Sequence, residues 1–169
     1  MRRMRTRRTM TPGAVRRLTE GEAELAAGVF GDALDAGRVR IVALPAWRRA
    51  FVAGPALVFW PARTALTDFS RAALSLQAVL VHELVHVWQA QSGVNLLAAK
   101  LRAGDGPAAY HYDPDEGPGF PELNIEQQAM VVQHAFLAAR MGAVPHPHET
   151  YAALLAGAPF GDGLKPFTA

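Results

Sequence analysis

His82 and His86 lie four residues apart in an apolar part of the chain, and Glu83 directly follows the first of them. On a helix this spacing places both imidazoles on one face, where they can bind one metal ion together. A carboxylate beside such a metal does not need to ligate it, because it can take a proton from a zinc-activated water and pass it to a leaving group. The pattern therefore predicts metal-assisted hydrolysis with Glu83 as general base.

The neighbours of this motif are almost all apolar, which indicates a buried helix. Positions 79–81, 84, 85, 87 and 88 are valine, leucine or tryptophan. Titratable groups inside a buried helix are costly unless they are paired or bind a metal. The alternative is a core helix in which the two histidines and the glutamate satisfy one another by hydrogen bonds, but this arrangement needs more partners than the three side chains provide.

A catalytic zinc needs three protein ligands and an open fourth position, so the two histidines require a partner. The chain has no cysteine, and the third ligand must therefore be a histidine or a carboxylate. Glu126 is the best candidate, because it lies among polar residues on a second long predicted helix. His134 is the other candidate, but about 12 Å of helix would separate it from Glu126, so one metal ion can hardly use both.

The elements around the motif predict a single domain over residues 18–169 with an α+β fold, in which a small antiparallel sheet packs on two long helices. Residues 19–30 predict a short helix capped by Thr19. Residues 38–44 and 56–60 predict two strands. The edge of this sheet could hold an extended peptide by strand addition, although a purely structural sheet fits the pattern at least as well.

The first long helix carries the two histidines. We expect Asp68 or Ser70 to be its N-cap, and Gly93 to end it with a left-handed residue. A short turn or helix is expected over residues 95–101. A loop rich in glycine, proline and aspartate then leads towards the second long helix.

The second long helix is expected over residues 121–141, with Gly142 just past its end. Its length allows it to pack along the first helix and to present Glu126 to the histidines. The tail over residues 144–169 contains several prolines and a possible short helix at 148–155. We expect this tail to wrap the surface.

The first 17 residues contain seven arginines and no acid. Without them the formal net charge of +2 becomes about −5, so the basic character belongs to this arm. We expect residues 1–17 to form a disordered, solvated arm. The alternatives are a tether to nucleic acid or an anionic surface, and a targeting segment. The arm lacks the apolar run of a secretory signal, so we expect a cytoplasmic protein with no membrane span. Export by a secretion system that uses no signal peptide is the alternative.

Seven short segments between residues 30 and 140 form a recognisable set. They are residues 30–35, 39–41, 58–61, 68–70, 82–89, 110–112 and 125–129. Together they resemble the zinc metallopeptidases described as vgr-related proteins, which are gluzincin-like and associated with polymorphic-toxin and type VI secretion genes. The resemblance implies a zincin-like metallopeptidase core with Zn²⁺ as cofactor. It also implies His82, His86 and Glu126 as ligands and Glu83 as catalytic base.

One position departs from the better-known gluzincins. Many of them have an acid four residues after the ligating glutamate that hydrogen-bonds a metal-binding histidine, and here that position is Met130. A ligand histidine normally needs such an acceptor to fix its tautomer. Asp68, Asp113 or a backbone carbonyl is therefore expected to serve instead.

The predicted function is peptide-bond hydrolysis by a zinc metallopeptidase acting on a peptide or protein. In this mechanism zinc polarises the water and the scissile carbonyl, Glu83 accepts the proton, and a nearby donor stabilises the oxyanion. Tyr110 and Tyr112 are the candidate donors, with His111 as a third choice, because their loop connects the two ligand helices. Simple packing of aromatic loop residues is the alternative for each of them.

Two other classes of function remain open. One is a catalytically inactive zincin-like adaptor or structural protein in a secretion or toxin system, for which Glu83 would be unnecessary. The other is a nucleic-acid-associated factor that uses the arginine-rich arm. The rest of the chain is acidic, and the arm has no aromatic residues between its arginines. Both features argue against binding to nucleic acid. The partners we expect are therefore a peptide or protein substrate and a component of a secretion system.

Overall fold

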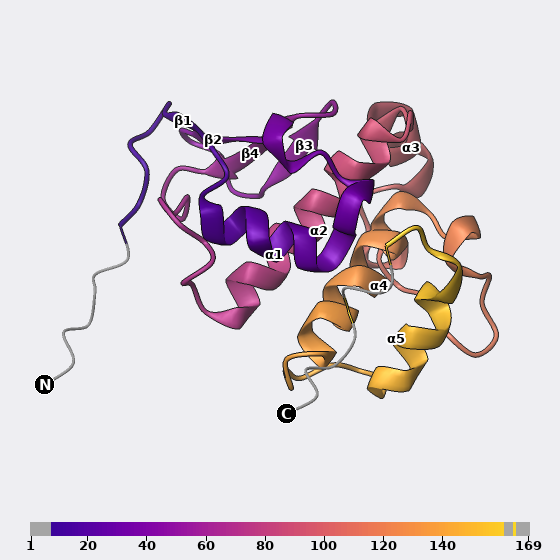
Figure 1. Ribbon diagram of the computed structural model, residues 1–169. Helices are drawn as coiled ribbons and strands as arrows, with labels where there is room; N and C mark the ends of the chain where they lie inside the picture. The colour runs from indigo at the N-terminus through magenta and orange to yellow at the C-terminus, as the bar shows by residue number, and fades with distance from the viewer. Residues whose placement is uncertain (1–7, 161–163, 165–169) are drawn as a thin grey trace, which may run out of the picture.

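The computed structural model describes residues 8–160 and Leu164, and that part of the chain has an α+β fold with five α-helices and one four-stranded sheet. Figure 1 shows the strands gathered at one side of the molecule, with helix α2 (Leu74–Gln91) beside them and helix α4 (Ile125–Ala138) farther from the strands. Helix α2 is central, because it packs against the sheet and against α4. Within the described residues, no helix combines the length and the apolar character that crossing a bilayer requires.

The sheet is mixed, and its strand order is β1-β2-β4-β3. The predicted antiparallel pairing of the two central strands is wrong, because β2 and β4 run parallel, with Ile41 opposite Val58. The unpredicted strand β3 explains the difference: the chain reverses before β3 and again at Gly54, which has a φ of 67°. Two reversals leave β4 parallel to β2. The strands are β1 (Val15–Arg17), β2 (Arg40–Leu44), β3 (Phe51–Ala53) and β4 (Leu57–Pro61).

Helix α1 (Glu20–Phe30) confirms the predicted first helix and its cap. The side chain of Thr19 accepts a hydrogen bond from the backbone of Glu22, and the Glu22 carboxylate accepts one from the backbone of Thr19. This reciprocal capping satisfies two backbone N–H groups that a helix start leaves free. Gly31 follows the helix with a φ of 53°, a conformation that favours glycine.

Residues 8–17 differ from the expected disordered arm, whereas residues 1–7 lie outside the described part of the chain. Met10 is buried in the core, and β1 pairs antiparallel with β2. Arg16 donates two hydrogen bonds of 2.7 Å to the fully buried carboxylate of Glu22. A buried acid needs such a cationic partner, so at least one arginine of the arm has a structural role that composition does not reveal.

Both predicted long helices are present, but each begins later than expected. The N-cap of α2 is Ala73, and neither Asp68 nor Ser70 caps it. Asp68 instead accepts hydrogen bonds from Ser70 and Thr19, which fixes the turn before α2 against the start of α1. Helix α4 begins after Asn124, which caps it, because residues 120–122 form a separate 3₁₀ turn. Gly93 does follow the end of α2, with a φ of 92°.

The C-terminal tail contributes to the core and does not simply wrap the surface. It contains helix α5 (His148–Leu154), which packs against α4. Tyr151 is fully buried, and Phe160 contacts the rings of Phe30 and Trp88. These large apolar side chains explain the difference from the expectation, since each is stabilised by removal from water.

Candidate metal centre

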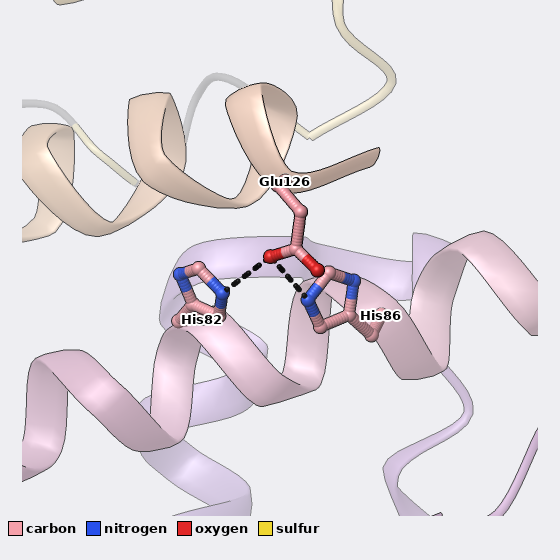
Figure 2. Close-up of side chains that lie close together, drawn as sticks. All are labelled: His82, His86 and Glu126. Carbon is pink, nitrogen blue, oxygen red and sulfur yellow. Dashed lines mark hydrogen bonds and ion pairs between the residues drawn. The ribbon is translucent and has the colours of Figure 1, made fainter. Parts of the chain in front are cut away.

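His82, His86 and Glu126 meet in the contact between the two long helices. The histidines project from successive turns of α2, and Glu126 lies in the first turn of α4, opposite them (Figure 2). Glu126 Oε2 lies 3.3 Å from Nε2 of His82 and 3.4 Å from Nε2 of His86. The structure therefore brings together the three residues that the sequence predicts as ligands.

The three side chains have the chemistry of a metal site. All are buried, and their potential ligand atoms lie within 4.8 Å of one another. Burial alone would raise the pKa of Glu126, but the hydrogen bonds with His82 and His86 hold it well below its usual range. The Glu126 carboxylate is therefore anionic, and two imidazoles with one carboxylate are a donor set that zinc uses in hydrolases. The residues fit zinc, whose presence stays a prediction.

Glu83 lies in the same cavity but is not one of the three converging groups. The cavity has a volume of about 1030 Å³, and its lining includes the two histidines, Glu83 and Glu126. Glu83 is buried, and its Oε2 has no hydrogen-bond partner among the described residues. Burial raises the pKa of Glu83, which the neighbouring histidines partly offset. Buried carboxylate oxygens normally have a hydrogen-bond partner, so this one marks Glu83 as a candidate functional residue.

A solved structure shares this fold and identifies the family. The effector domain of Pseudomonas aeruginosa VgrG2b aligns with a TM-score of 0.65 and 31% sequence identity, over 88% of this chain and 86% of that domain. This chain belongs to the VgrG2b effector-domain family.

The sequence relationship extends to a full-length member of the VgrG2b effector-domain family. The chain is 36% identical over 136 residues to the type VI secretion system spike protein VgrG2b of Pseudomonas aeruginosa, a match that covers 73% of this chain. The matched segment spans only 13% of the spike protein. No model of a protein family matches the sequence.

In this member of the VgrG2b effector-domain family, Gln89 orients the second histidine. Gln89 Oε1 lies 2.8 Å from Nδ1 of His86, so Nδ1 can donate and leave Nε2 free to face Glu126. The Gln89 amide is itself held by hydrogen bonds to Ile125 and Gln128 at the start of α4. A polar residue three positions after His86 was visible in the sequence, but its role depends on the packing of the two helices.

The acids expected to orient the histidines do not do so. Asp68 is occupied in the turn before α2, and Asp113 accepts hydrogen bonds from the backbone of Asp115 and Glu116. Nδ1 of His82 is buried and has no hydrogen-bond partner among residues 8–160 and Leu164. Of the two histidines, only His86 therefore has a side-chain partner at Nδ1.

Replacing Gln89 with leucine is expected to weaken zinc binding by about 10–100-fold, the usual effect of losing an outer partner of a ligand histidine. Leucine has a similar size but cannot accept a hydrogen bond from His86. Competition with a chromogenic chelator measures the affinity. Gln91→Leu is the matched control, because Gln91 lies on the same helix but bonds to Asp35 and Pro55. Equal zinc affinity in both variants and the wild type would show that Gln89 has no role in zinc binding.

Lys100 holds the second carboxylate oxygen of Glu126, and the sequence does not predict this role. It lies on α3 (Leu96–Ala103), and its Nζ donates to Glu126 Oε1 at 2.7 Å and to the hydroxyl of Tyr110 at 3.2 Å. Burial alone would lower the pKa of Lys100, but these hydrogen bonds raise it above its usual range. A lysine on Oε1 leaves Oε2 facing the imidazoles. No motif marks Lys100, because its position depends on how α3 packs against α4.

Of the three candidate donors, the structure brings only Tyr110 to the cavity. Its ring lies 6.4 Å from that of His82, and its hydroxyl accepts a hydrogen bond from Lys100. Tyr112 is bonded elsewhere, with its hydroxyl 2.6 Å from Nδ1 of His134. Burial raises the pKa of Tyr112 and lowers that of His134, so the phenol donates to a neutral imidazole. Tyr112, His134 and the exposed His111 do not line the cavity.

Proposed function

We propose that this chain is a zinc-dependent peptidase that acts as an effector of a type VI secretion system. The observation that carries the enzymatic part is the convergence of the buried side chains of His82, His86 and Glu126 beside Glu83 in one cavity. Membership of the VgrG2b effector-domain family supports the secretion part, because the relative is a spike protein of that system.

The side chains of the cavity would divide the reaction among them. A zinc ion held by the two histidines and Glu126 would supply a Lewis acid that polarises a water molecule and the scissile carbonyl. Glu83 accepts the proton of the attacking water and returns it to the amine as the peptide C–N bond breaks. The Tyr110 hydroxyl, which accepts its own hydrogen bond from Lys100, donates its proton towards the oxygen that becomes negative.

The second candidate function is a catalytically inactive adaptor in the same secretion system. Family membership supports its secretion-associated character directly, and the names of the two relatives refer to a spike protein and an effector domain, not to proteolysis. The two candidates differ over Glu83. An adaptor with a structural zinc needs the three ligands but has no use for the additional, unpaired carboxylate of Glu83.

Cleavage of a broad peptide library by the purified chain separates the two candidates. We expect the zinc-loaded protein to cut a subset of the peptides, a chelator to abolish the cleavage, and added zinc to restore it. Mass spectrometry of the products identifies the broken bonds. A protein that binds one zinc ion per chain and cuts nothing in the library supports the adaptor.

A further inference from the structure

The cavity extends beyond the metal centre to an outer end with apolar walls. The lining there includes the loop and edge strand over residues 46–55 and the start of α3. Trp47 is 50% exposed and Leu97 is 73% exposed, although both line the cavity. Trp47 contacts the ring of Phe51, which stacks on a ring of β4 at 4.9 Å, so its wall is anchored to the sheet. Large apolar side chains that line an open cavity are typical of a binding surface.

The same outer end is positively charged. Arg48 and Arg49 line it, and both are exposed. Neither side chain forms an ion pair or a hydrogen bond with another described residue. The chain contains no acid between Asp35 and Asp68, so the sheet offers these arginines no counter-charge. Asp105 also lines the cavity, but its carboxylate pairs with Lys100 at 3.2 Å.

The unpaired strand edge in the wall of the cavity favours an extended polypeptide as its occupant. The cavity volume of about 1030 Å³ lies at the upper limit of small-molecule sites, which occupy about 300–1,000 Å³. Strand β3 forms one wall and is the last strand in the sheet order, so its outer side is not paired within the sheet. An unpaired strand edge can bind an extended chain through backbone hydrogen bonds.

We propose that the outer end of this cavity selects polypeptide segments in which a bulky apolar side chain is flanked by acidic residues. The apolar side chain contacts Trp47 and Leu97, and the acidic side chains pair with Arg48 and Arg49. This inference rests on the proposed function, because it names the substrate class of the same site. It adds a requirement that the metal centre does not impose, since the reacting groups act on the peptide bond itself.

Binding of fluorescent peptides to zinc-loaded Glu83→Gln protein tests this inference without interference from cleavage. The first peptide has a phenylalanine between aspartates and glutamates, the second has lysines in their place, and the third has alanine in place of the phenylalanine. Fluorescence anisotropy gives each Kd. We expect the first peptide to bind about tenfold more tightly than either of the others, and added salt to weaken its binding.

Reversing the charge of the two arginines tests whether they produce the preference for the acidic peptide. Arg48→Glu with Arg49→Glu should weaken binding of the acidic peptide by about tenfold and strengthen binding of the lysine peptide. The matched control is Arg38→Glu with Arg63→Glu, which changes the net charge equally at exposed positions that do not line the cavity. Trp47→Ala should reduce the preference for phenylalanine over alanine.

Equal binding of the acidic and lysine peptides, or equal losses in the two double variants, would overturn the inference. Cleavage by the wild-type protein is measured separately, so the two proposals fail in different assays. Cleavage without any preference for acidic flanks rejects the selectivity and leaves the peptidase intact. Selective binding without cleavage supports the selectivity and rejects the peptidase.

Discussion

Glu83→Gln reduces peptide hydrolysis by about 10²–10⁴-fold if Glu83 is the general base, while zinc binding and the fold remain as in the wild type. Glutamine is nearly isosteric with glutamate but cannot accept a proton. Glu83 is not one of the three converging groups, and its Oε2 has no partner among the described residues that the amide would lose. Initial rates on a peptide cut by the wild type, at equal zinc occupancy, measure the effect.

The control for this substitution is Glu122→Gln, which makes the same chemical change at an exposed position outside the cavity. We expect it to retain the wild-type rate. The melting temperature of both variants shows whether the fold is preserved. If Glu83→Gln cleaves as fast as the wild type, the carboxylate has no role in proton transfer and the assigned mechanism is wrong.

Glu126→Ala is expected to abolish tight zinc binding. The loss of zinc affinity should exceed the loss of about 10–100-fold expected when an outer partner such as Gln89 is replaced. The substitution removes the anionic ligand and leaves only the two imidazoles. It also leaves Lys100 without its 2.7 Å partner, so part of the local order of α3 will be lost. Zinc content after dialysis against a weak chelator, and affinity by competition, measure the result.

His134→Ala is the matched control for the third ligand, because His134 was the alternative candidate on the same helix. The structure places its imidazole against Tyr112 and outside the metal cavity. We expect this variant to keep the zinc affinity of the wild type. Loss of zinc in His134→Ala but not in Glu126→Ala would reverse the assignment of the third ligand.

The convergence of the ligands could be predicted from the sequence because it depends mostly on local regularities. The spacing of His82 and His86 places them on one helix face wherever that helix lies. Glu126 could be found because it stands near the start of a second long helix, among a run of polar residues that is unusual for so apolar a chain. The α+β class and the cap of α1 follow in the same way from local patterns.

The features that the sequence does not predict depend on contacts between segments far apart in the chain. Gln89 and Lys100 act on the ligands only because α2, α3 and α4 pack together, and no spacing marks them. Strand β3 is three residues long, too short for an alternating pattern, so the parallel pairing of the central strands was not predicted. Composition predicts a solvated Arg16, because it does not show that Glu22 is buried beside it.

Zinc titration of metal-free protein, with peptide cleavage recorded at each point, tests the central claim most directly. The claim is that one zinc ion at His82, His86 and Glu126 makes the cavity a hydrolytic site. We predict that cleavage rises in proportion to bound zinc and reaches its maximum at one ion per chain. Full zinc occupancy without cleavage, or cleavage that persists in the metal-free protein, would contradict it.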